Sequence, residues 1–297
     1  NLVRELLSRN YRVRIFAEPG RQTLTLKGLN MERAEGNLLD AESIYNAASG
    51  CDAIIHAAAS TRVWPVRSEI VNRINIEGTK NVVDAALKAS IKKMIYVGTA
   101  NSFGFGTKEK PGNEMQPYRS AKYRLDYMDS KYKAQQLILK NIKEKNLPAV
   151  IVNPTFMLGP FDYGPSSGAM ILAIYNGKVP GYATGGRNYI YVKDVAVAIA
   201  NALTKGRIGE CYILGNSNLS YREAFGKIAE TIGVKKPEMK IPPFFTKAYG
   251  CIGTLMGKIT GTAPTVSYNL TRIACDEHYY SAQKAIDELC LPQTAIE

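Results

Sequence analysis

Apolar positions along the chain alternate between helical spacing and short continuous runs. Helical spacing predicts helices over 1–9, 40–48, 68–90 and 123–145. Apolar runs predict strands over 11–17, 51–57, 93–99 and 148–153, the last stopped by Pro154. Strands apolar on both faces and joined by helices are typical of a parallel, doubly wound sheet with right-handed crossovers. The sequence therefore predicts an α/β fold.

Glycine and proline become more frequent after residue 158, which indicates a change of organisation. A strand–helix pair over 189–203 and a strand over 210–214 are expected to return to the first unit. We therefore expect a larger domain of residues 1–158, to which 189–214 return. A smaller C-terminal α/β domain of 159–188 and 215–297 is expected to bind substrate.

Composition excludes several classes of protein. Of the 297 residues, 45% are hydrophobic and 22% are charged, as in ordinary globular proteins and unlike disordered or coiled-coil chains. The net charge of +12 suggests nucleic acid or an anionic membrane surface as partners. However, the lysine clusters are short and interrupted, which favours a solvated surface, and no apolar stretch is long enough to span a bilayer. We therefore expect a small-molecule substrate, with neither nucleic acid nor membrane as partner.

The cysteines and histidines indicate a reduced compartment without metal chemistry. Five scattered cysteines contain no Cys-x-x-Cys pair, which is typical of free thiols in a cytoplasmic protein. With only two histidines, and no acidic residues at ligand spacing, we expect no metal site.

Small and polar residues follow three of the predicted strands. Because ligands bind outside the carboxyl ends of strands in doubly wound sheets, these positions are candidates for a flat cofactor and its substrate. They are His56, Ala57 and Ala58 after the first, Thr99 and Asn101 after the second, and Asn153 and Thr155 after the third.

A Tyr-x-x-x-Lys pair on a helix can place an ammonium near a phenol, lowering the phenol pKa and making it a general acid or base. Four pairs occur: Tyr118/Lys122, Tyr127/Lys131, Tyr189/Lys193 and Tyr280/Lys284. Only Tyr127/Lys131 lies inside the helix that follows the Thr99 strand, so we select it.

Five segments together resemble an extended short-chain dehydrogenase/reductase. They are His56–Ala58, Asn75–Asn81, Thr99–Gly104, Tyr127…Lys131 and Asn153…Pro160. The chain is most similar to the NAD-dependent epimerase/dehydratase family, in its dihydroflavonol-4-reductase-like branch. This resemblance implies a Rossmann-type fold and a homodimer formed through two long helices.

The resemblance also implies roles for individual residues. Tyr127 would transfer the proton, Lys131 would hold the nicotinamide ribose and lower the Tyr127 pKa, and Thr99 would bind the substrate oxygen. Asn75 would lie beside the active site, as a catalytic residue or as a structural one that kinks its helix. Further implied cofactor contacts are His56, Ala57, Ala58, Asn153, Thr155 and, near adenine, Asn37 and Leu38, where Asn37 replaces an aspartate.

Two features of the N-terminal region bear on the cofactor. The family begins with a strand and a Gly-x-x-Gly-x-x-Gly loop, and neither precedes the first helix here. We expect that both were cut from this sequence. After the second strand of the family's order, Glu18 favours NAD, whereas Arg21 keeps NADP possible.

The substrate itself is not defined. Arg187 resembles the arginine that grips a nucleotide diphosphate in sugar epimerases, and Trp64 could form an apolar wall for a hydrophobic ketone. The favoured hypothesis is hydride transfer between nicotinamide and a carbonyl or secondary alcohol. A nucleotide-sugar epimerase or dehydratase with tightly held NAD and a non-catalytic dinucleotide-binding sensor are the alternatives.

Overall fold

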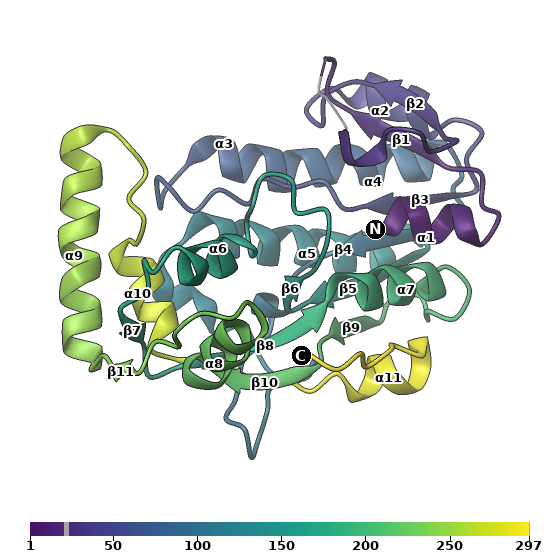
Figure 1. The fold of residues 1–297 in the computed structure, drawn as a ribbon. Helices are drawn as coiled ribbons and strands as arrows, with labels where there is room; N and C mark the ends of the chain where they lie inside the picture. Colours follow the sequence, from purple (N-terminus) through teal and green to yellow (C-terminus); the bar gives the residue numbers. More distant parts are fainter. Residues whose placement is uncertain (21–23, 297) are drawn as a thin grey trace.

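Four parallel strands form the central sheet, in the order β3-β4-β5-β9 (Figure 1). The structure, a computed structural model, describes residues 1–20 and 24–296. The strands are β3 (Ala53–His56), β4 (Lys93–Val97), β5 (Ala149–Pro154) and β9 (Cys211–Leu214). The predicted α/β fold with a parallel sheet is confirmed.

Helices cover both faces of this sheet, which is why β5 is buried along its whole length. One face packs on α4 (Gly78–Lys88) and α5 (Asp126–Lys145). The other packs on α7 (Val192–Ala202) and α11 (Gln283–Leu289). A further helix, α1 (Leu2–Ser8), lies against α7.

Strands β1 (Arg14–Ala17) and β2 (Glu32–Glu35) form a separate parallel pair beside α2 (Ala41–Ala48). Within the described residues, no ladder joins this pair to β3. The sequence pattern missed β2 because its residues are mostly charged and exposed. A strand and glycine loop preceding Asn1 stay a prediction.

The two predicted long helices are interrupted at their N-terminal ends. The segment predicted as one helix over 68–90 comprises α3 (Glu69–Asn72), a π-helical turn η2 (Arg73–Glu77) and α4. Helix α5 begins three residues later than predicted, because Arg124 adopts a left-handed conformation (φ 52°) after the 3₁₀ turn η4 (Ser120–Tyr123). Two other 3₁₀ turns are η1 (Leu24–Leu26) and η3 (Ala100–Ser102).

A second sheet is built around β8 (Gly186–Tyr191), which pairs antiparallel with β10 and parallel with β12 and β6. Tyr189–Tyr191, expected to return to the larger domain, thus lie in this smaller sheet, whereas α7 and β9 join the large one. The domain division stays a prediction. The remaining elements are β6 (Phe156–Leu158), α6 (Ala169–Tyr175), β7 (Gly181–Tyr182), β10 (Ser217–Ser220), α8 (Tyr221–Thr231), β11 (Met239–Lys240), α9 (Pro243–Thr260), α10 (Tyr268–Ala274) and β12 (Glu277–His278).

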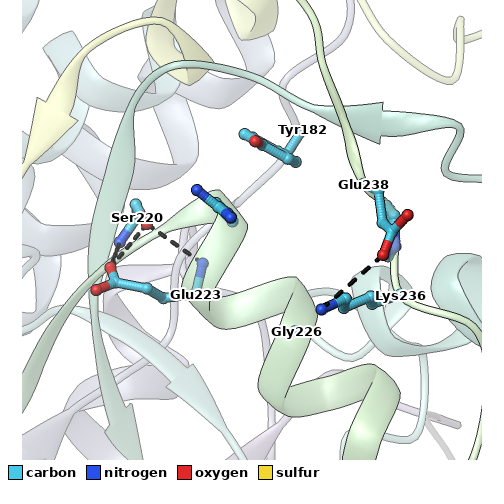
Figure 2. A pocket seen from close by; sticks show the side chains of 8 residues that line it. Tyr182, Ser220, Glu223, Gly226, Lys236 and Glu238 are labelled. Carbon is cyan, nitrogen blue, oxygen red and sulfur yellow. Dashed lines mark hydrogen bonds and ion pairs between the residues drawn. The ribbon is translucent and has the colours of Figure 1, made fainter.

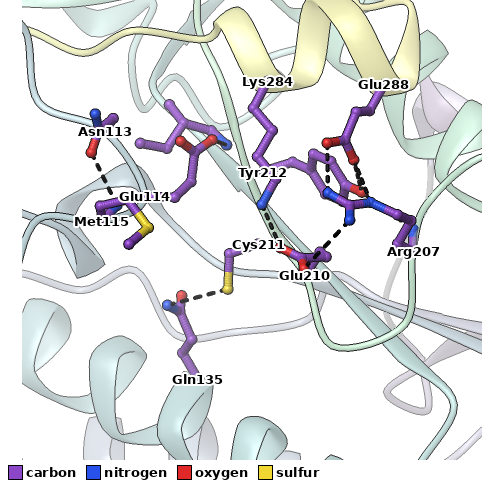
Figure 3. A network of polar contacts seen from close by, with 11 residues as sticks. Asn113, Glu114, Met115, Gln135, Arg207, Glu210, Cys211, Tyr212, Lys284 and Glu288 are labelled. Atoms are coloured by element: carbon purple, nitrogen blue, oxygen red, sulfur yellow. Dashed lines mark hydrogen bonds and ion pairs between the residues drawn. The ribbon is translucent and has the colours of Figure 1, made fainter.

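A polar network fastens α11 to the edge of the large sheet (Figure 3). Glu288 accepts two hydrogen bonds from the Arg207 guanidinium, at 2.6 and 2.9 Å, and one from the Tyr212 hydroxyl at 2.6 Å. Lys284 pairs with Glu210 at 2.6 Å. The C-terminal helix therefore supports β9 from the face opposite α5.

Two cavities lie in the part of the chain around the smaller sheet. One, of about 490 Å³, is lined by polar residues that include Ser220, Glu223 and Lys236 (Figure 2). The other, of about 480 Å³, is mostly apolar and lies between β8 and α8. Neither contains a residue from the predicted catalytic set. No helix in the described ranges is long and apolar enough to cross a membrane.

Candidate active site

The residues that follow β3, β4 and β5 lie together at the carboxyl end of the large sheet, because these strands are parallel and adjacent. Ala57 and Ala58 follow β3 and are exposed. Thr99 follows β4 and caps the 3₁₀ turn after it, its side chain accepting a hydrogen bond from the Asn101 amide at 3.3 Å. Thr155 follows β5. The carboxyl end of the sheet therefore has small, exposed residues after β3 and a threonine hydroxyl after β4 and after β5.

Helix α5 brings Tyr127 and Lys131 to the carboxyl end of the sheet. Its first turn is held by Asp126, which accepts hydrogen bonds from Arg67, the Ser68 amide and Asn72 at 2.6 to 2.9 Å. The Tyr127 phenol lies close enough to the Thr99 side chain for Thr99 to lower its pKa. One turn further along α5, Lys131 Nζ donates to the Val97 carbonyl at 2.8 Å. The phenol therefore lies near the Thr99 hydroxyl just beyond β4, and the ammonium lies at the last residue of that strand.

Burial controls the charges of this group. It raises the pKa of Tyr127, and the Thr99 side chain and the charge of Arg187 oppose that rise only in part. Burial also lowers the pKa of Lys131 to about 7. The expectation that Lys131 lowers the Tyr127 pKa differs from this structure. The phenol is desolvated, the ammonium is held at a carbonyl, and the cation that acts on Tyr127 is Arg187. Tyr127 is accordingly a protonated acid at neutral pH.

The other Tyr-x-x-x-Lys pairs have other partners. Tyr118 donates to Asp129 at 2.6 Å, which with burial raises its pKa, and Lys122 pairs with Asp276 at 2.7 Å. Lys284 is held by Glu210, and Tyr189 lies in a strand. Of the four pairs, Tyr127 and Lys131 form the pair in which both residues lie at the carboxyl end of β4.

Asn75 lies in the π-helical turn, a feature often found at functional sites. Its amide accepts from the Ser60 amide at 2.7 Å, and donates to the Ser60 carbonyl at 3.0 Å and to Ser130 Oγ at 2.9 Å. The side chain is 2% exposed. Of the two roles considered for Asn75, these contacts favour positioning, since they tie the loop after β3 to α5.

Replacing Asn75 with alanine is expected to lower the free energy of unfolding by about 2–3 kcal/mol, because it leaves polar groups of Ser60 and Ser130 without their hydrogen-bond partner. Urea denaturation measures the change. Asn176→Ala, which removes a hydrogen bond to Leu172 O at an exposed helix end, is the matched control and should cost less than about 1 kcal/mol. Equal losses in the two variants would contradict the positioning role.

Two predicted cofactor residues are turned into the protein. His56 is 4% exposed and bonded through Nε2 to Thr79 Oγ1 at 3.0 Å, and burial lowers its pKa to about 3, so it is neutral. Asn153 is fully buried and donates to the Thr99 carbonyl at 3.0 Å and to Gln135 at 2.7 Å. Both residues therefore make internal contacts that stabilise the segments carrying the site, rather than facing a ligand.

The predicted adenine side of the site lies near β1 and β2. Glu18 is exposed directly after β1, and Arg21 lies outside the described residues. Asn37 is exposed after β2, where its Oδ1 accepts from the Leu39 amide at 2.8 Å, and the Leu38 carbonyl accepts from Asn81 at 2.9 Å. The Asn37 oxygen is therefore used to form a local turn.

The three predicted substrate residues are dispersed. Asn101 follows Thr99 in η3, and Trp64 lies against Gly257 of α9. Arg187, from β8, donates through Nε to the Tyr221 hydroxyl at 2.7 Å, and its guanidinium lies over the Phe156 ring. The charge of Arg187 lowers the Tyr127 pKa, so its guanidinium lies within electrostatic reach of that phenol.

Sequence reasoning missed the tyrosines around Arg187. The Tyr189 and Tyr280 hydroxyls are buried without a hydrogen-bond partner in the described part of the chain, and the Arg187 charge acts on the pKa of both. No sequence signal joins residues 187, 189, 221 and 280, because the second sheet brings them together.

A Rossmann-type sheet with a tyrosine, lysine and threonine beyond its central strands defines a short-chain dehydrogenase/reductase of the extended type. Residues 1–215 match the family model described as "NAD dependent epimerase/dehydratase family". The chain belongs to this NAD(P)-binding enzyme family, as its sequence resemblance implied.

Individual proteins show the same relationship. The chain is 30% identical over its full length, and 88% of the relative's, to a Synechocystis sp. protein named "Putative dihydroflavonol 4-reductase". The crystal structure of gox2253 matches 98% of this chain and 88% of its own, with 33% identity and a TM-score of 0.85. The structure of PA4631, a nucleoside-diphosphate-sugar epimerase from Pseudomonas aeruginosa, matches 99% of this chain and 88% of its own, with 25% identity and a TM-score of 0.80.

Proposed function

We propose that this chain is an NAD(P)-dependent oxidoreductase that transfers a hydride between nicotinamide and a carbonyl or secondary alcohol. The observation that carries the proposal is the placement of Tyr127 beside Thr99 at the end of β4, with Lys131 one helical turn further along α5. The relationship to a protein named as a dihydroflavonol 4-reductase supports a reductase.

In the reducing direction, the Tyr127 phenol would donate its proton to the carbonyl oxygen, which Thr99 Oγ1 would orient. The phenol carries its proton at neutral pH; burial raises its pKa and so weakens it as an acid, whereas Thr99 and the charge of Arg187 act in the opposite direction. In the oxidising direction, the same phenol oxygen would have to accept the proton from the alcohol, which requires Tyr127 to be deprotonated first. The nicotinamide, when bound, supplies or accepts the hydride.

The residues at the carboxyl end of the sheet fit a nicotinamide cofactor. Ala57 and Ala58 are exposed after β3 and leave room for a ring to approach the backbone. An ammonium has three donors, and in the described residues the Lys131 ammonium donates one hydrogen bond, to Val97 O, so it has donors left for ribose hydroxyls. Glu18 after β1 supports NAD, because a carboxylate binds a ribose diol and repels a 2′-phosphate.

A nucleotide-sugar epimerase or dehydratase is the second candidate, favoured by Arg187. The partly buried Arg187 guanidinium, whose charge acts on the Tyr127 pKa, is suited to a diphosphate, and the relationship to PA4631 supports this alternative. Both candidates use the same proton-transfer residues and differ in whether the cofactor leaves between turnovers.

Denaturing the purified full-length polypeptide and identifying any released nucleotide tests this proposal. For the oxidoreductase we expect an empty protein that then binds added NADH more tightly than NADPH, measured by calorimetry. NAD released in near-equal amount to protein would instead establish the epimerase or dehydratase class. A protein that neither releases nor binds either nucleotide would contradict both and favour a different ligand.

A further inference from the structure

Helix α9 has an inverted distribution of side chains. It is an 18-residue helix that begins after Pro242 and ends at Gly261, which has a left-handed conformation. Its small residues Gly250 and Gly257 are buried, whereas its large apolar residues point outward. The α9 face comprises Phe244, Phe245, Tyr249, Ile252, Leu255, Met256 and Ile259, each at least 52% exposed.

These seven residues form one continuous surface. At 100° per residue they fall within an arc of about 140°, opposite the buried glycines. A surface helix normally places its apolar arc toward the core, and a contiguous exposed apolar face marks an interaction site. In Figure 1, α9 stands at one end of the molecule with α10 between it and the rest.

The charges around the α9 face define its partner. From Lys235 to Thr260 the chain carries five lysines, all exposed, and one acidic residue, Glu238, which is paired with Lys236. Lys247 and Lys258 lie on α9 itself, together at one border of the apolar arc. An apolar face bordered by cations complements the interface of an anionic bilayer, where aromatic and aliphatic side chains enter and lysines reach phosphates.

We propose that α9 docks in the plane of an anionic lipid bilayer. The sequence predicted no membrane partner because the lysine clusters are short and interrupted and no segment spans a bilayer, but an in-plane helix needs neither a span nor a long basic run. A second copy of the chain fits less well, because a two-fold interface sets each patch against itself, with lysines facing lysines. Leu270 and Ile273 of α10 pack in the cluster that includes Tyr127. Docking therefore places the catalytic end of α5 one helix away from the lipid.

Co-sedimentation with lipid vesicles tests the proposal. The full-length protein is expected to pellet with vesicles of equal parts phosphatidylglycerol and phosphatidylcholine, and far less with phosphatidylcholine alone. The double variant Ile252→Glu/Ile259→Glu should reduce the bound fraction at least about tenfold, and Lys247→Glu/Lys258→Glu should reduce it on anionic vesicles by a similar factor.

Matched control variants distinguish binding through α9 from non-specific binding of the protein to vesicles. Met115 is 89% exposed on a loop elsewhere, and Lys133 is exposed on α5, so Met115→Glu and Lys133→Glu should bind as the wild type does. Unchanged melting temperatures establish that the variants fold. Absence of wild-type binding, or equal loss in the control variants, overturns the proposal. So does a dimer in sedimentation velocity that Ile252→Glu/Ile259→Glu dissociates while vesicles bind nothing, since that result assigns the face to a second copy.

Discussion

Replacing Tyr127 with phenylalanine is expected to lower kcat by about 10²- to 10⁴-fold, the range that a positioned general acid contributes. The substitution removes the phenol that we propose passes a proton to the substrate oxygen, and keeps the ring that packs with Leu125, Met128 and Ile273. We therefore expect cofactor binding and the melting temperature to change little. Steady-state kinetics with the substrate and calorimetry with the nucleotide measure the two effects.

Tyr118→Phe is the matched control, because Tyr118 heads the neighbouring Tyr-x-x-x-Lys pair and bonds Asp129. Removing that hydrogen bond should cost about 1 kcal/mol of stability and leave kcat within about threefold. A Tyr127→Phe enzyme with unchanged kcat would refute the assignment of the proton donor. Loss of activity in Tyr118→Phe alone would transfer the assignment to Tyr118.

Replacing Lys131 with methionine is expected to make the protein less active and more stable. Burial lowers the pKa of Lys131 from 10.5 to about 7, so the folded chain carries a poorly solvated ammonium at low pH. Between pH 7 and 10.5 the unfolded chain binds more protons than the folded one, and stability rises with pH. Below about pH 7 both states are charged and the full cost is present. The gain from Lys131→Met should then be about 1–3 kcal/mol, and it should vanish towards pH 10.5.

Urea denaturation at pH 6 and pH 9, together with the KM for the nucleotide, tests this expectation. Activity should fall by about 10²-fold or more, because we propose that the ammonium holds the cofactor ribose. Lys133→Met, at an exposed position two residues along α5, should show neither effect. A Lys131→Met protein that is less stable than the wild type at pH 6 would mean that the hydrogen bond to Val97 outweighs the cost of burying the charge.

The α9 face illustrates what sequence patterns hide. Its apolar residues recur with helical spacing, and such a stripe usually faces the core. In the structure the glycines occupy the inward side, where neighbouring residues approach closely: a Cβ on Gly250 would clash with the Thr271 hydroxyl of α10. The sequence contains the amphipathic pattern, but only the packing partner decides which side is covered.

Local sequence determined the strands of the central sheet and indicated three candidate site residues. Apolar runs bounded by turns specify β3, β4, β5 and β9, since burial on both faces requires continuous apolar strands. The exposed, charged β2 gave no such signal. Tyr127, Lys131 and Thr99 were recognisable because one helix and one strand end carry all three.

Tertiary structure decided what surrounds them. Asn75, His56 and Asn153 take their partners from distant segments, so their roles depended on contacts that no spacing encodes. The charge of Arg187, from a second sheet, acts on the Tyr127 pKa, and desolvation is the largest cause that shifts it. Residue type and spacing are local properties, whereas burial, partner and net field arise only when the chain has folded.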